Sequence, residues 1–304
     1  MTFSTDFSGR SLLVGFSALF AAACCAPAAA QVPAANPYGE LETKYLFGFT
    51  SGADIGAEGE KEVSVETSGR FGKRVGTYAA LEHRLEFETT LSQFVQIELG
   101  LVGSTHNIRN VPGIDDIGKS NLQGAFAEIR YLLIEKTPNS RFGLTLSFEP
   151  NWARIDDSTG ERVTKFEFET KLQADYEFVP NTVYGALNLI YEPEFVRDIG
   201  KRGWERETTL GVSAALAGRI ASNVVLGAEL GYFRKYDQGL LFNRFKGEAL
   251  FAGPTLYVQL TRKSFLSAAF STQIAGRSTD NPTLHLDLDN FARYRAKLKF
   301  GLEF

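Results

Sequence analysis

The last stretch of the chain, residues 290–304, alternates strictly between apolar and polar side chains. Apolar residues fall on every second position from Ala292 to Phe304, and the positions between them carry Arg293, Arg295, Lys297, Lys299, Gly301 and Glu303. A period of two indicates a β-strand, because alternate side chains point to opposite faces of a sheet. The ionic face would meet bulk water in a secreted sandwich, whereas in a membrane barrel it would meet water in the lumen.

The same alternation recurs in earlier segments of the chain. In residues 163–178 the charged side chains share one parity, and a helical period of 3.6 would scatter them around a cylinder. The sequence therefore predicts about twelve strands, with ten or fourteen if one hairpin is miscounted. The eleven earlier segments are 40–49, 77–90, 94–102, 121–135, 141–149, 163–178, 182–192, 204–220, 224–235, 247–261 and 265–275.

The connections between these segments alternate in length. Short turns such as 179–181 and 221–223 alternate with longer stretches such as 50–76 and 276–289. A sandwich has no reason to sort its loops in this way, whereas a membrane barrel has short periplasmic turns and longer extracellular loops. The pattern predicts an all-β fold, a single transmembrane antiparallel up-and-down β-barrel with both termini in the periplasm.

The N-terminal segment has the pattern of an export signal. Arg10 precedes an apolar run, residues 12–25, and small residues follow at 26–30, which predicts a secretory signal peptide cleaved before Gln31. Lipoprotein processing at Cys24 is the alternative. A short lead, 31–39, and the barrel, 40–304, would follow.

Composition excludes several classes of function. Both cysteines lie in the predicted signal peptide, so the mature chain would have no disulfide, thiolate metal site or cysteine nucleophile. A net charge of −4 argues against a nucleic-acid partner, which requires a basic surface.

The end of the chain carries a further signal. Phe304 is terminal, with Leu302 and Phe300 at the third and fifth places from the end. This resembles the assembly signal of Gram-negative outer-membrane barrels, a class and not one family, and the resemblance covers nearly the whole mature chain. It implies residence in the outer membrane, contact with outer-membrane lipids and lipopolysaccharide, and recognition by the barrel-assembly machinery.

Two charged walls are expected in the lumen. The basic wall consists of Arg293, Arg295, Lys297 and Lys299. In a barrel of twelve strands the opposite side carries an acidic wall of Glu167, Glu169, Asp175, Glu177, Glu192, Glu205 and Glu207. Opposed walls would set up a transverse field that orders polar solutes. Alternatively, the charges pair across a filled interior, a reading favoured by Lys165 and Lys171 on the acidic wall.

No catalytic residue, metal site or cofactor is predicted. His83 would face lipid without a nearby serine, and the paired aspartates 115–116 and 156–157 are typical of solvated loop tips, although calcium or bridged lipopolysaccharide could use their oxygens. His106 and His285 belong to separate loops. The sequence favours a passive channel for small polar or charged solutes over an enzyme. A closed structural or surface-interaction barrel is the alternative, and a lipid-acting hydrolase is third.

Overall fold

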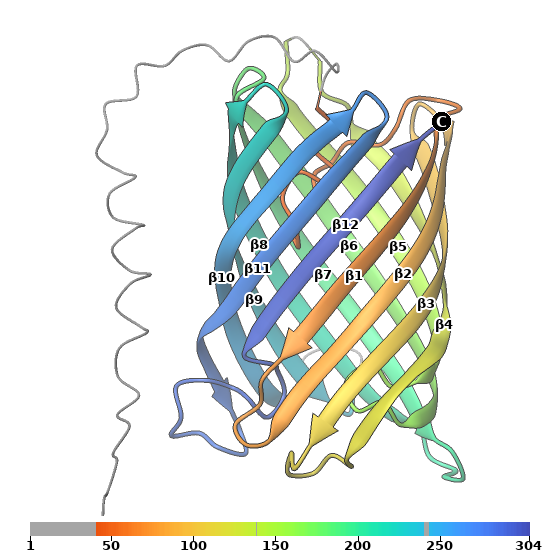
Figure 1. Cartoon of the computed structure of the whole chain (residues 1–304), viewed down its shortest axis with the longest axis vertical. Coiled ribbons are helices and arrows are strands. Elements are labelled where there is room, and N and C mark those ends of the chain that lie inside the picture. Colours follow the sequence, from red (N-terminus) through yellow and green to blue (C-terminus); the bar gives the residue numbers. More distant parts are fainter. Residues whose placement is uncertain (1–40, 138, 240–242) are drawn as a thin grey trace, which may run out of the picture.

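A computed structural model describes residues 41–304 apart from 138 and 240–242, and in it twelve antiparallel strands form a closed barrel (Figure 1). The predicted signal peptide, its cleavage site and the lead at 31–39 lie outside the described residues. The strands are β1 (Lys61–Phe71), β2 (Thr77–Ser92), β3 (Val95–Arg109), β4 (Ile117–Ile134), β5 (Phe142–Ile155), β6 (Arg162–Val179), β7 (Val183–Asp198), β8 (Glu205–Ala221), β9 (Val224–Asp237), β10 (Arg244–Thr261), β11 (Ser264–Ser278) and β12 (Tyr294–Glu303).

Each strand pairs with its neighbours in the sequence, and the barrel closes where the first strand meets the last. β1 pairs with β12 in an antiparallel register that runs from Glu62 opposite Glu303 to Phe71 opposite Tyr294. Closure leaves no unpaired sheet edge, which a lipid environment would not tolerate. The predicted fold class and the count of twelve strands are confirmed.

The position of the first strand was predicted wrongly. Of the predicted strand 40–49, the described residues 41–49 do not join the wall; β1 instead lies within the stretch 50–76 that was expected to be a loop. Gly48 has a φ of +87°, a left-handed conformation that interrupts an extended strand. In β1 Val65 points outward and Glu66 inward, as in the other strands. Ser68 and Gly69 interrupt the alternation of apolar and polar residues that would have indicated this strand in the sequence.

The two faces of the wall have opposite chemistry. Leu99, Leu189 and Leu298 on the outer face are between 47% and 54% exposed, whereas Glu88 and Gln173 on the inner face are at most 5% exposed. Such an inversion is expected where lipid surrounds the barrel and polar groups face the lumen. The chain is therefore an outer-membrane β-barrel. None of its described residues forms a helix long and apolar enough to cross a membrane.

The connections differ in length between the two ends of the barrel. At the end where the chain terminates, the turns include 93–94, 180–182, 222–223 and 262–263, and this is the periplasmic end. The opposite, extracellular end carries loops that include 110–116, 156–161 and 279–293. The first two of these loops are shorter than expected because the strands continue farther; β3 and β4, for example, take up most of the predicted loop 103–120. The loop 279–293 is about as long as the predicted loop 276–289 but begins and ends a few residues later.

Candidate functional site

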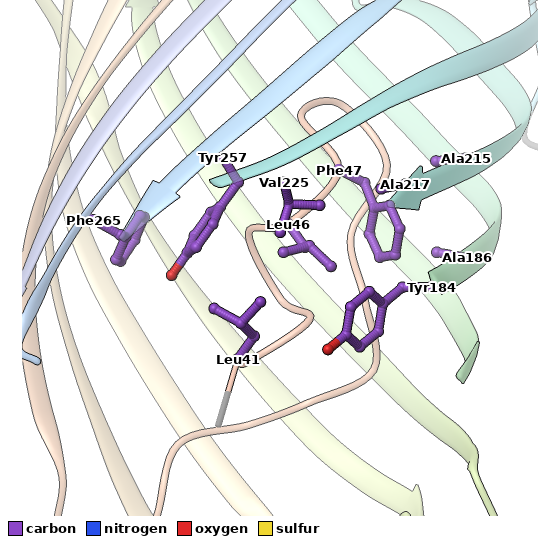
Figure 2. Packing of buried hydrophobic residues seen from close by; sticks show 10 residues of the cluster. All are labelled: Leu41, Leu46, Phe47, Tyr184, Ala186, Ala215, Ala217, Val225, Tyr257 and Phe265. Carbon is purple, nitrogen blue, oxygen red and sulfur yellow. The ribbon is translucent and has the colours of Figure 1, made fainter. Parts of the chain in front are cut away.

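Residues 41–60, here called the plug, lie inside the barrel at its periplasmic end (Figure 1). Leu46 and Phe47 are 1% and 0% exposed. Figure 2 shows Leu41, Leu46 and Phe47 among side chains of the wall, and the cluster includes Tyr184, Ala186, Ala215, Ala217, Val225, Tyr257 and Phe265. Three alanines in this cluster leave room for the plug, and the burial of its large apolar groups stabilises the docked position.

A buried lysine ties the plug to the acidic side chains of β2 and β3. The Lys44 ammonium forms a salt bridge with Glu88 and lies 3.4 Å from an oxygen of Glu98. The Tyr45 hydroxyl donates a hydrogen bond of 3.0 Å to Glu88, and its ring stacks on Phe265 with centroids 4.9 Å apart. Buried charges require such partners, so the plug supplies a counter-ion that this part of the wall would otherwise lack.

Wall side chains bind the backbone of plug residues 49–54. The Glu229 carboxylate accepts the N–H groups of Phe49 and Thr50, each at 3.0 Å. Asn188 accepts the N–H of Ser51 at 2.8 Å and donates to the Ser51 carbonyl at 2.7 Å. These contacts recognise peptide groups and not side chains.

The same recognition continues through the next three residues. Asp175 accepts the Ala53 N–H at 2.9 Å, and the Thr145 hydroxyl donates to the Ala53 carbonyl. Arg130 donates to the carbonyls of Gly52 and Asp54, at 2.9 and 3.2 Å. The wall residues of this set, here called the peptide track, are Arg130, Thr145, Asp175, Asn188 and Glu229, and none is more than 5% exposed.

Lys136 holds the plug from the periplasmic connection between β4 and β5. Its ammonium lies 2.7 Å from Asp54 of the plug and 3.1 Å from Asp175 of the wall. Burial opposes the charge on Lys136, but these two carboxylates outweigh it and raise the pKa of Lys136. The lysine therefore remains charged and bridges the plug to the wall.

A small cavity remains between the plug and the wall beside Arg295. The Arg295 guanidinium lies 4.2 Å from the ring centroid of Phe49, and Phe233 and Phe251 are 5.0 and 5.2 Å away. Ser213, Glu229 and Ser271 also line the cavity. Arg295 forms no hydrogen bond or ion pair with the described part of the chain, so the aromatic faces are its main contacts.

The basic wall pairs with its neighbours and not with the acidic wall across the lumen. Lys297 lies 2.8 Å from Glu66 of β1, and buried Lys299 forms a salt bridge with Glu86 of β2. Arg293 is exposed at the extracellular end of β12. Strands that are neighbours or next neighbours in the barrel bring these opposite charges into contact.

Three members of the acidic wall pair with lysines on their own strand or on nearby strands. Among its members, Glu167 pairs with Lys165 at 2.9 Å and Glu169 with Lys171 at 2.6 Å. Glu207 binds both Lys235 and Lys246 at 2.5 Å. The remaining members lie in different settings: Asp175 contacts the plug, Glu177 accepts the N–H of Asn181, Glu192 is half-buried beside Glu167 and Glu169, and Glu205 is exposed at the rim.

The extracellular loop between β5 and β6 contacts strands far from it around the barrel. Asp157, in the connection between β5 and β6, lies 2.6 Å from Arg70 and 2.7 Å from Lys165. Burial opposes its ionisation, but these two cations hold the pKa of Asp157 well below its usual range. The Tyr78 hydroxyl also donates to the Ser158 carbonyl at 2.9 Å. The loop is thereby bound to three strands of the wall.

The histidines and loop aspartates have structural contacts. His83 on the outer face contacts Thr67 and Thr105 at 3.0 and 3.3 Å, and His106 contacts the Asp157 carbonyl at 3.2 Å. Asp156 accepts hydrogen bonds from Ser158 and Thr159 of its own loop. In the described part of the chain no three His, Cys, Asp or Glu side chains form a group that could hold a metal ion.

Sequence reasoning missed the plug and the peptide track. The signal for the plug was its glycine pattern, with Gly48, Gly52 and Gly56 inside a stretch assigned partly to a strand. The signal for the track was Asn188, a neutral amide between Leu187 and Leu189 that faces inward and is fully buried. A buried amide requires partners, and here the plug backbone provides them.

A family model described as "Family of unknown function (DUF6662)" matches residues 40–304. No curated protein sequence matches the chain. Among solved structures, the COG4313 outer membrane channel from Pseudomonas putida F1 is similar, with a TM-score of 0.53 and 12% identity over 83% of this chain and 98% of that one. This likeness supports the fold.

Two porin structures align less well. The NanC porin has a TM-score of 0.46 and 10% identity, over 79% of this chain and 98% of its own. The KdgM porin in complex with disordered oligogalacturonate has a TM-score of 0.42 and 10% identity, over 81% of this chain and 99% of its own.

Proposed function

This chain belongs to a family of unknown function, DUF6662, and we propose that it is an outer-membrane channel for small polar or charged solutes, closed by its N-terminal plug. The observation that carries the proposal is that the plug is not built into the barrel wall. Up to Ala57, the backbone–backbone hydrogen bonds of the described plug residues, such as Leu46 to Thr43 and Gly52 to Lys44, stay within the plug. A segment of this kind can leave the lumen without breaking the barrel.

The lumen that would open is polar. Its wall carries Gln96, Gln173 and Asn188 together with paired charges of both signs. Small hydrated solutes exchange hydrogen bonds with such groups, and lumen charges set the preference among them. Locally paired walls predict weaker ion selectivity than two opposed, unpaired walls would give.

Single-channel recording of the refolded, full-length protein in planar bilayers tests the proposal. Phe47→Asp places a charge in a fully buried apolar site and should release the plug, so the conductance should rise well above that of the wild type. Leu284→Asp, on an exposed extracellular loop, is the matched control and should conduct like the wild type.

A second variant keeps the proposal testable if Phe47→Asp fails to fold. Gly48→Val also displaces the plug, because a side chain at φ +87° is strained and its Cβ would lie 2.5 Å from Ala269. Heat-dependent electrophoretic mobility checks that each barrel has formed. Correctly folded Phe47→Asp and Gly48→Val proteins that conduct no more than the wild type would contradict the channel.

A closed structural barrel is the second candidate function. The tight pairing of Lys299 with Glu86, together with the loop bound around Asp157, favours an interior that stays filled. This candidate predicts negligible conductance in both plug variants and unchanged integrity of the outer membrane in cells that carry them.

A further inference from the structure

We infer that the peptide track is a binding site for short extended peptides once the plug has left the lumen, an inference that rests on the proposed channel function. In the plugged barrel, plug residues 49–54 already bind to the track in the way expected of such a peptide. Within residues 49–54, wall side chains bind the N–H groups of four residues and the carbonyl groups of four. The recognised chemistry is the peptide bond itself.

The track would recognise a free peptide because its polar side chains are already arranged around a peptide backbone. With the plug docked Asn188 and Thr145 are fully buried, and Asn188 accepts the N–H and donates to the C=O of a single residue, Ser51. Without the plug these groups bond to water in the open lumen, and a bound peptide takes the place of that water. A peptide restores the same hydrogen bonds in the same places.

The shape of the track limits which peptides fit. Ala53 lies close to Gly143 of the wall: a Cβ added at Gly143 would lie 3.1 Å from the Cβ of Ala53. The plug sequence at this point, Thr50 to Ala53, contains only small side chains. We therefore expect peptides with small residues to bind and peptides with bulky residues at these positions to be excluded.

The charges along the track match the ends of a short peptide. At one end, the Glu229 carboxylate accepts two N–H groups and can accept an ammonium in their place. At the other end, Arg130 donates to two carbonyl groups and suits a terminal carboxylate. A zwitterionic peptide of a few residues therefore complements the track better than a sugar or a nucleotide does.

Fluorescence anisotropy with a labelled Phe-Thr-Ser-Gly-Ala-Asp peptide, the sequence of residues 49–54, tests this inference on full-length Phe47→Asp protein. Binding should be saturable in the variant and at least about tenfold weaker in the wild type, whose track is occupied. Adding Asn188→Ala should weaken binding about tenfold, because two hydrogen bonds are lost. Asn223→Ala, in a periplasmic turn, is the matched control and should leave the affinity unchanged.

A second peptide isolates backbone recognition. Methylation of the nitrogen that corresponds to Ser51 removes the hydrogen bond to the Asn188 oxygen without changing any side chain, and should weaken binding. Equal binding of the methylated peptide, or equal binding by wild type and Phe47→Asp, would overturn the inference. Gly48→Val replaces Phe47→Asp if the latter fails to fold.

Current recordings separate this inference from the proposed function. Peptide binding without conductance in the plug variants would contradict the channel and leave the track in place. Conductance that the peptide neither blocks nor alters, together with no anisotropy change, would overturn the track and leave the channel. If both hold, the peptide should reduce the current through Phe47→Asp and have less effect when Asn188→Ala is added.

Discussion

Lys299 of β12 forms a salt bridge with Glu86 of β2, across the intervening strand β1 where the barrel closes. The two side chains are 4% and 3% exposed. Ser64 of β1 donates to the same carboxylate at 2.6 Å, and the ring of Tyr45 lies 4.1 Å from the lysine ammonium. The pair therefore joins the seam of the barrel to the plug.

Removal of Lys299 should destabilise the barrel. Lys299→Gln leaves Glu86 buried without its counter-ion, and the free energy of unfolding should fall by about 3–5 kcal/mol. Lys297→Gln is the matched control: its side chain is 20% exposed, its partner Glu66 is 12% exposed, and its loss should be smaller. Urea unfolding of the two refolded variants measures the free energy of unfolding of each. Equal decreases would show that the burial of Lys299 and Glu86 does not add to the stabilisation by their salt bridge.

Plug docking should weaken as the pH rises. Burial, reinforced by Glu60 and Asp54, raises the pKa of Glu42 to about 8, whereas a released plug would return it to about 4.3. The docked state therefore takes up a proton, so its stabilisation is complete below about pH 4 and is lost as the pH rises through about 8. Conductance should accordingly increase between about pH 6 and pH 9.

Glu42→Gln isolates this group from the other carboxylates of the lumen. Glutamine cannot ionise, so the variant should lose most of the increase in conductance between those pH values. Glu58→Gln, on an exposed part of the plug, is the matched control and should retain it. An unchanged pH profile in Glu42→Gln would assign the effect to other groups.

The lipid-facing surface predicts a position-dependent cost of charge. Leu189 is 47% exposed on the outer face near the middle of β7, and Leu189→Arg should lower the free energy of unfolding by about 2–4 kcal/mol in lipid bilayers. Leu284 is 39% exposed on the extracellular loop, and Leu284→Arg should change it by less than about 1 kcal/mol. Similar costs at the two sites would mean that the outer face does not meet lipid.

The terminal aromatic residue predicts an assembly defect. Phe304→Ala keeps the backbone bond from its N–H to the Lys61 carbonyl, at 2.9 Å, but removes the side chain proposed for recognition with Phe300 and Leu302. Assembly into the outer membrane should fall while export continues, as measured by periplasmic accumulation. Phe178→Ala, which removes an aromatic side chain of 57% exposure against 59% for Phe304, should assemble normally.

The sequence by itself determined the wall of this protein except for its first strand, which was placed at 40–49 and not at β1. Strict alternation in residues such as 163–178 assigns each side chain to the lumen or to lipid, because a strand has a period of two and a one-residue shift would reverse every assignment. Repetition of that pattern was enough to predict an antiparallel barrel of twelve strands. It also placed Arg295 and Glu167 on the inner face.

Only the tertiary structure decided what fills the lumen. Residues 40–49 alternate well enough to suggest a strand, but the positive φ at Gly48 and the contacts of the plug with Glu88, Asn188 and Glu229 place the plug inside the barrel. Likewise, periodicity shows that Lys299 faces inward but not that Glu86 is its partner. The physical reason is that pairing within the lumen depends on distances between residues far apart in the chain, and a local period carries no information about those distances.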